Sequence, residues 1–218
     1  MATMAEIYRE VSGIVHGLDT ELSGVIRYAN KALKEVAGVV LLPELLETQT
    51  TINTVVGTAY ASLPGDYMRN LHYCYSNTTY RKINIYDDVR ILNRKFSRLD
   101  LAGNVVGVAR KGSSLYYQRI PSSAETLRIH YYKNPTILTD GDSQPDCLPE
   151  FIVSPLLVNY IAKELFSRIE LDVTESKGKT QYCEDRFRQA MGELSAYIGP
   201  ESREPQYITD DVNLDGYL

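Results

Sequence analysis

Apolar residues at the two ends of the chain recur every three to four positions, which is the spacing of one face of an α-helix. This spacing predicts four helices, over residues 4–16, 20–37, 149–171 and 174–197. Thr3 and Glu6 have the spacing of a capping box at the start of the first helix, and Pro149 suits the first turn of the third. Each end of the chain is therefore expected to supply a pair of amphipathic helices.

The middle of the chain is rich in β-branched residues and tyrosine and carries no helical stripe. Strands are predicted over residues 50–60, 70–76, 80–86, 104–110, 114–119 and 125–133. Turn residues separate them, among them the run Leu63-Pro64-Gly65-Asp66. A short helix over residues 86–94, with two aspartates near its start, interrupts the strands.

The order of helices, strands and helices predicts an α+β fold rather than an alternating α/β fold. We expect the N- and C-terminal helices to form one helical bundle, with an antiparallel β domain inserted between them. The expected parts are N-terminal helices in residues 1–48, the β domain in 49–135, C-terminal helices in 136–198 and an extended, flexible acidic tail in 199–218.

Charge is distributed unevenly along the 218 residues, although the formal net charge is only −5. Residues 69–133 contain 12 basic and 4 acidic side chains, whereas residues 199–218 contain one basic and five acidic ones. A basic middle between acidic flanks predicts charge complementarity with a neighbour or within an assembly. No apolar run approaches the ~20 residues of a membrane span, and the N-terminus lacks a secretory signal. We therefore expect a soluble protein made in a cytoplasm, with no membrane partner.

The sequence contains no motif that would carry catalysis or hold a cofactor or metal. A Gly-x-Ser-x-Gly motif, a phosphate-binding glycine-rich loop and a His-Glu-x-x-His motif are all absent. The three histidines and the three cysteines have no recognisable motif spacing; they are His16, His72, His130, Cys74, Cys147 and Cys183. The cysteines are predicted to be reduced, partly buried thiols. We therefore assign no catalytic, cofactor-binding or metal-binding residue, and a non-enzymatic protein is expected.

Two acidic clusters resemble cation sites only weakly. Asp140, Asp142 and Asp146 lie among glycine, serine and proline, which are residues that turns use. Residues 211–216 match the first half of a calcium loop, but no ligand for its twelfth position follows. We interpret the first cluster as a loop and the second as part of the acidic tail.

A nucleic-acid interface is an alternative function for the basic middle of the chain. Arginine and lysine are interleaved there with eight tyrosines, namely Tyr73, Tyr75, Tyr80, Tyr86, Tyr116, Tyr117, Tyr131 and Tyr132. Basic grooves with stacking aromatic rings bind single strands. The same tyrosines could equally be half-buried strand residues, because tyrosine is common in sheets.

Short motifs occur in a characteristic order along the chain. They are residues 28–37 (YANKALKEVA), 63–69 (LPGDYMR), 112–117 (GSSLYY), 120–121 (IP) and 127–135 (LRIHYYKNP), then Leu138, Asp146 and 148–151 (LPEF). Over roughly residues 20–197 this order resembles the head–tail adaptor proteins, also called connector or head completion proteins, of tailed double-stranded-DNA bacteriophages. Val106 and Val108 depart from the resemblance, since many relatives have aromatic residues there, and the acidic tail is less typical.

The resemblance implies a structural virion protein at the head–tail junction, present in the host cytoplasm during assembly. Such adaptors form a ring, usually of twelve copies, under the portal protein. They join the DNA-filled capsid to tail or tail-nozzle proteins and leave a channel through which double-stranded DNA passes without sequence-specific binding. The helices form the docking ring, and the β region projects sideways or towards the tail.

The tail carries the candidate partner contacts. Four of its apolar residues are expected to anchor on a partner surface; they are Tyr207, Ile208, Tyr217 and Leu218. Exposed aromatic and aliphatic residues on a flexible segment suit folding upon binding. The alternative is a tail without a partner.

Overall fold

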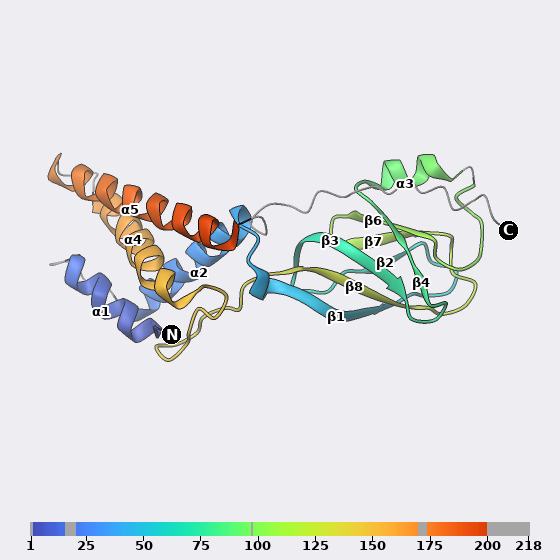
Figure 1. Ribbon diagram of the computed structural model, residues 1–218, viewed down its shortest axis with the longest axis horizontal. Helices are drawn as coiled ribbons and strands as arrows, with labels where there is room; N and C mark the ends of the chain where they lie inside the picture. The colour runs from blue at the N-terminus through green and yellow to red at the C-terminus, as the bar shows by residue number, and fades with distance from the viewer. Residues whose placement is uncertain (1, 16–20, 97, 170–173, 200–218) are drawn as a thin grey trace.

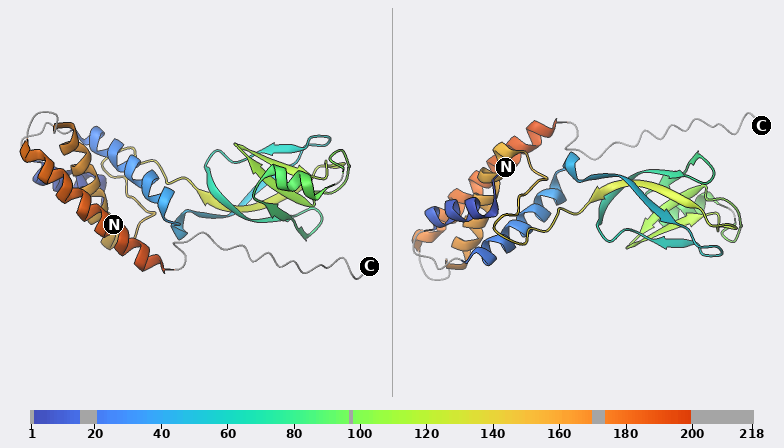
Figure 2. Two further views of the ribbon diagram at one scale, coloured as in Figure 1. Left: turned by 90° about the horizontal axis from the view of Figure 1, so that it is seen from above. Right: turned by 90° about the horizontal axis from the view of Figure 1, so that it is seen from below.

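The computed structural model describes residues 2–15, 21–96, 98–169 and 174–199. Figure 1 shows an elongated molecule, with a helical half at one end and a β half at the other. The views from above and below in Figure 2 show the same end-to-end arrangement, with the two halves meeting at a narrow junction. The predicted α+β fold, with N- and C-terminal helices around an inserted β region, is confirmed.

The helical half contains four long helices, each within two residues of a predicted one at either end. They are α1 (Met4–Ile14), α2 (Leu22–Val39), α4 (Glu150–Ile169) and α5 (Thr174–Ile198), with a 3-10 turn at Pro43–Leu45 after α2. The predicted capping box is present, since the Thr3 hydroxyl accepts the Glu6 amide and the Glu6 carboxylate accepts the Thr3 amide. Helices α1 and α2 both pack on α4, which pairs with α5.

The core of the helical half consists mainly of aliphatic residues and alanine, with few large aromatic rings. Tyr160 of α4 is fully buried there, and its hydroxyl donates to Glu35 of α2 at 2.7 Å. Burial, reinforced by the Glu35 carboxylate, raises the pKa of the Tyr160 hydroxyl. The hydroxyl therefore stays protonated and acts as a donor that ties α2 to α4.

The β half consists of two four-stranded sheets packed face to face. Sheet A has the order β1 (Leu46–Asn53), β8 (Thr126–Lys133), β3 (Tyr67–Ser76), β4 (Arg81–Lys82). Sheet B has the order β2 (Tyr60–Ser62), β7 (Ser114–Gln118), β6 (Gly107–Lys111), β5 (Asn84–Tyr86). All pairs are antiparallel except β5 with β6, which is parallel, so sheet B departs from the expected antiparallel pattern.

Two predicted strands were wrong in the same way, because each divides where the chain crosses from one sheet to the other. The predicted strand 50–60 divides into the end of β1 and the start of β2 at a turn in which Gly57 has φ +75°. The predicted strand 80–86 divides at Ile83, which is buried between β4 in sheet A and β5 in sheet B. Strand propensity is continuous across both places, so it gave no sign of either crossing.

A buried carboxylate links the two sheets. Glu125, just before β8, accepts the Ser76 hydroxyl of sheet A at 3.1 Å and the Val105 amide before β6 at 2.9 Å. Its own amide donates to the Thr54 hydroxyl oxygen at 2.9 Å. The side chain is only 2% exposed, and both of its oxygens are hydrogen-bonded, as burial of a carboxylate requires.

The short helix α3 (Val89–Lys95) covers the β5–β6 end of sheet B. Its Leu92 is buried close to Gly107, where a Cβ atom would lie 2.9 Å from the Tyr86 ring and 3.0 Å from Leu92. The absence of a side chain at Gly107 therefore lets α3 approach the sheet. The predicted helix 86–94 is confirmed, although it begins three residues later.

The three cysteines are free and buried, which confirms the prediction of reduced thiols. Burial raises the pKa of the Cys74 and Cys147 thiols to about 12, so both are protonated at neutral pH. The predicted division of the chain at residues 48, 135 and 198 stays a prediction.

Candidate interaction surfaces and the junction between the halves

Arg69 of β3 joins the β half to the helical half. Its guanidinium donates to the carbonyl oxygens of Gly38 at 2.7 Å and Val40 at 3.0 Å, at the C-terminal end of α2. These carbonyls have no partner within the helix, and the negative end of the helix dipole lies there. One cation thus satisfies two acceptors that belong to the other half.

Apolar packing surrounds this contact. Met68 beside Arg69, and Tyr132 opposite it on β8, both pack against the core of the helical half. The segment that leads from α2 to β1 is buried at Val40, Leu41 and Leu42. The junction is therefore a small core with a charged hydrogen-bonded centre, rather than an open linker.

Several motifs that carry the family resemblance are joined by hydrogen bonds between segments that are far apart in the sequence. Asn30 of α2 accepts the Leu138 amide and donates to the Leu138 carbonyl, both at 2.9 Å. Asp66, after the turn at Pro64, accepts the Tyr131 hydroxyl at 2.8 Å and, through its backbone carbonyl, the Asn134 amide at 2.7 Å. The sequence motifs contain these residues, but they did not predict which residues are hydrogen-bonded to each other. They also did not predict that Arg69 contacts α2.

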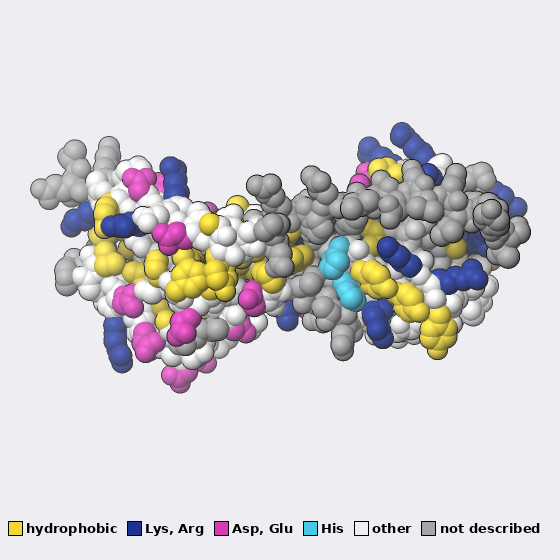
Figure 3. Space-filling view, in the orientation of Figure 1, with side chains coloured by type: hydrophobic (Ala, Val, Ile, Leu, Met, Phe, Trp, Pro, Cys, Tyr) yellow, Lys and Arg dark blue, Asp and Glu magenta, His cyan; other side chains and the backbone are white. Residues whose placement is uncertain are grey.

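Charge is segregated between the two halves. In the view of Figure 3, acidic side chains gather over the helical half, whereas the β half shows mainly lysine and arginine. This arrangement follows the sequence pattern of a basic middle between acidic flanks. Because the halves lie end to end, the two charged surfaces do not face each other within one molecule (Figure 1).

The outer face of sheet A carries tyrosine and histidine rings beside Arg128. The rings of Tyr73 and Tyr75 are nearly parallel, at 9° with centroids 6.5 Å apart, and the His130 ring lies 4.8 Å from Tyr73. His72 lies 5.8 Å from His130, and the exposed Arg128 pairs with Tyr75 across the strands. Figure 3 shows the histidines beside hydrophobic and basic side chains on this face.

The helical half exposes aromatic residues on two of its helices. Phe151 of α4 and Tyr197 of α5 are 54% and 65% exposed, and their rings meet edge to face at 5.1 Å. A shallow groove of about 460 Å³ lies elsewhere among α1, α4 and α5, where Ile14 and the exposed Tyr182 contribute to its lining. Solvent-exposed rings of this kind are typical of protein contact surfaces.

The candidate cation ligands form no site in the part of the chain that the structure describes. No group of three or more His, Cys, Asp or Glu side chains is arranged to hold a metal ion within the described ranges. Asp140 instead accepts the Ser143 hydroxyl and amide, both at 2.8 Å, and these bonds lower the pKa of its carboxyl group. His16 and the calcium-like residues 211–216 lie outside the described residues.

The four predicted anchors of the tail, Tyr207, Ile208, Tyr217 and Leu218, also lie outside the described residues. Among the helices that the structure does describe, none is both long and apolar enough to span a bilayer.

The described chain is thus a helical bundle joined end to end to a β sandwich, with opposite charge on the two halves and exposed rings on both. The chain belongs to the SU10 adaptor protein family, whose model matches residues 2–209. It is thus a phage adaptor, a structural component of the virion at the head–tail junction. No curated protein matches the chain.

The Arg69 contact can be tested by hydrogen exchange. Replacing Arg69 by Ala removes both bonds to α2, and hydrogen bonds to charged groups contribute about 1.5–3 kcal/mol each. We expect amides of residues 36–42 to exchange at least about tenfold faster in Arg69→Ala. Arg69→Lys should restore little of the protection of these amides from exchange, because an ammonium group lacks the planar fork of the guanidinium.

Arg81→Ala is the matched control, since Arg81 is an exposed arginine at the β4 edge of the same sheet. Equal exchange in Arg69→Ala and Arg81→Ala would show that the contact does not hold the junction.

Proposed function

We propose that this adaptor forms a ring, of twelve copies as in the proteins it resembles, that docks under the portal and joins the DNA-filled capsid to tail or tail-nozzle proteins. Its role is non-enzymatic and lies in its interfaces. The observation that carries the proposal is membership of the adaptor family over residues 2–209. The ring assembles in the host cytoplasm, and its channel passes double-stranded DNA without binding a particular sequence.

Charge segregation supports the ring. The basic β half of one copy can face the acidic helical half of the next, because the two charges lie over different halves of a copy (Figure 3). An acidic lining of the channel would also let DNA pass, since attraction to phosphate requires positive charge. Exposed rings such as Phe151 and Tyr197 then supply apolar contact at an interface.

Electron microscopy of the purified chain with its portal protein tests the ring. We expect closed rings at low ionic strength and fewer of them above about 0.5 M salt, because exposed charge pairs are screened there. Image averages of particles should place the chain directly below the portal. Rings that form equally at all salt concentrations would contradict the charge-pairing interface, and particles without the chain at that position would contradict the proposal as a whole.

The tail is proposed to anchor a partner through Tyr207, Ile208, Tyr217 and Leu218. Deleting residues 200–218 should lower incorporation of the chain into particles, as measured by quantitative immunoblotting of purified virions. The deletion leaves both cores whole, since their buried residues lie between Met4 and Leu194. Unchanged incorporation would remove the tail from the partner contacts.

Single-stranded nucleic acid is the second candidate ligand, favoured by the Tyr73–Tyr75 pair beside Arg128. Fluorescence anisotropy of a labelled oligonucleotide titrated with the chain decides between the two functions. We expect no submicromolar binding at 150 mM salt for the adaptor. Submicromolar binding that weakens steeply with salt, and that Tyr73→Ala reduces, would favour the nucleic-acid function instead.

A further inference from the structure

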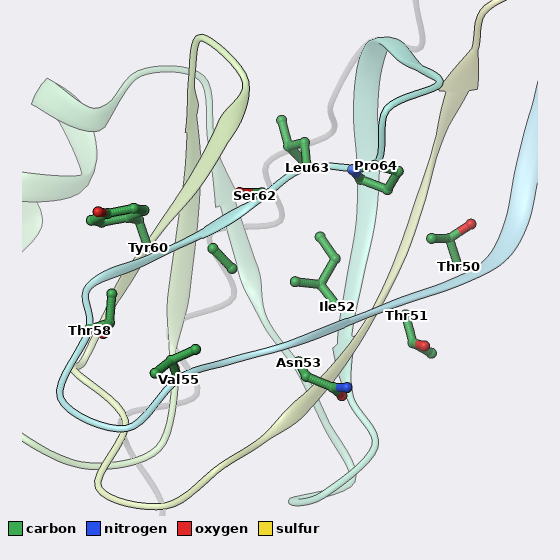
Figure 4. A pocket seen from close by; sticks show the side chains of 11 residues that line it. Thr50, Thr51, Ile52, Asn53, Val55, Thr58, Tyr60, Ser62, Leu63 and Pro64 are labelled. Atoms are coloured by element: carbon green, nitrogen blue, oxygen red, sulfur yellow. The ribbon is translucent and has the colours of Figure 1, made fainter.

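An open groove of about 570 Å³ lies between the two sheets, where neither sheet has a further strand. It is bounded by β1, the outermost strand of sheet A, and by β2, the outermost strand of sheet B. Figure 4 shows Thr51, Ile52 and Asn53 of β1 on one side, with Tyr60 and Ser62 of β2 on the other. Two strand edges thus face a common space.

The other outer strands of the two sheets are protected. Strand β4 is two residues long and consists of Arg81 and Lys82, and charged side chains discourage pairing with a further strand. Strand β5 is packed by α3. Residues 50–53 and 60–62, in contrast, contain no charged side chain. Natural proteins rarely leave such an edge bare, so an occupant is expected.

The strand registers direct backbone groups into the groove. The Thr54 amide bonds to the Glu125 carbonyl, and hydrogen-bonded residues alternate in an antiparallel pair, so the amides of Thr51 and Asn53 point away from β8. The Leu63 amide likewise bonds to Ser113, which turns the Ser62 amide away from β7. A strand placed in the groove would meet donors on both sides.

We propose that residues 206–209 of the same molecule, Gln-Tyr-Ile-Thr, occupy this groove as an added strand in the unassembled chain. They would leave the groove when Tyr207 and Ile208 anchor a partner, so the inference concerns the state before assembly. Tyrosine, isoleucine and threonine favour strands, and the four residues belong to the longest uncharged run of the tail, residues 205–209. Such strand addition takes affinity from main-chain bonds and specificity from alternate side chains.

The tail begins close enough to reach the groove. Helix α5 ends beside the start of β1, at the junction, in all views of Figures 1 and 2. Tyr207 lies eight positions after Gly199, and a stretch of that length can span up to about 28 Å. Thr51 lies five residues along β1 from Leu46, about 17 Å at the usual strand rise. The tail would run outward from the junction, parallel to β1 and antiparallel to β2.

Acidic residues flank the segment, and basic residues lie one or two strands away from the groove. Glu204 precedes the uncharged run, and Asp210 and Asp211 follow it. On sheet A, Arg128 pairs with Thr51. On sheet B, Ser62 pairs with Ser114, which pairs in turn with Lys111. A short tether also gives the tail of the same molecule an effective concentration in the millimolar range, which favours it over the tail of another copy.

Hydrogen exchange with mass spectrometry on the full chain tests this proposal without any ring or partner. We expect the amides of Thr51, Asn53 and Ser62 to exchange about tenfold faster in Tyr207→Ser/Ile208→Ser than in the unaltered chain. The matched control is Asn213→Ser/Leu214→Ser, which changes the same tail outside the proposed strand and should leave these amides unaffected. The protection should be the same at 1 and 50 μM protein.

A second pair of variants tests the other side of the contact. Thr51→Pro removes an amide that faces the groove without removing a bond to β8, whereas Thr51→Val retains the amide. The amides of residues 207–209 should exchange faster in Thr51→Pro than in Thr51→Val. Equal rates in the unaltered chain and Tyr207→Ser/Ile208→Ser would overturn the proposal, and protection that grows with protein concentration would show that another copy supplies the strand.

Discussion

The guanidinium group of Arg69 on the last carbonyls of α2 holds together two bodies that each have a core of their own. Only the segments before β1 and after β8 connect these bodies covalently, so their relative placement depends on what is packed at the junction. A helix C-terminus attracts a cation, and an arginine can satisfy two carbonyls at once. Met68 and Tyr132 pack against the helical core beside the contact and add apolar contact to the junction.

The end-to-end placement of the two halves keeps their opposite charges apart. If the halves could fold onto each other, acidic helices and basic strands would neutralise each other within one molecule. The junction prevents this, and the opposite charges remain available to other copies or other proteins. Complementary charge of this kind raises the rate and the specificity of protein association.

The sequence predicted the helices well because their apolar stripes repeat over many turns and their caps are local. It failed at residues 50–60 and 80–86, where strand propensity runs on while the chain changes sheets. The turn at Gly57 and the burial of Ile83 between two sheets depend on tertiary packing. The alternation of apolar and polar residues along a strand does not show where such a crossing occurs. The parallel pairing of β5 with β6 was missed for the same reason.

The motif order was more informative than any single motif, and the structure explains why. Asn30 meets Leu138, and Asp66 meets Tyr131 and Asn134, so these motifs supply the partners of long-range hydrogen bonds. Arg69 stands in the same motif as Asp66, but its acceptors are backbone carbonyls, which carry no side-chain signature. The partner surfaces of the molecule had no sequence signal beyond charge and exposed aromatic composition.

The two connections between the halves run side by side, because Leu46 at the start of β1 pairs with Tyr132 near the end of β8. Beside the packed contact of Arg69 and Met68, these two adjacent strands form a narrow ribbon. It bends most easily perpendicular to its own plane and resists displacement within that plane. Any swing of the β half against the helical half should therefore follow one direction, so that a set of these molecules under load would all deform the same way.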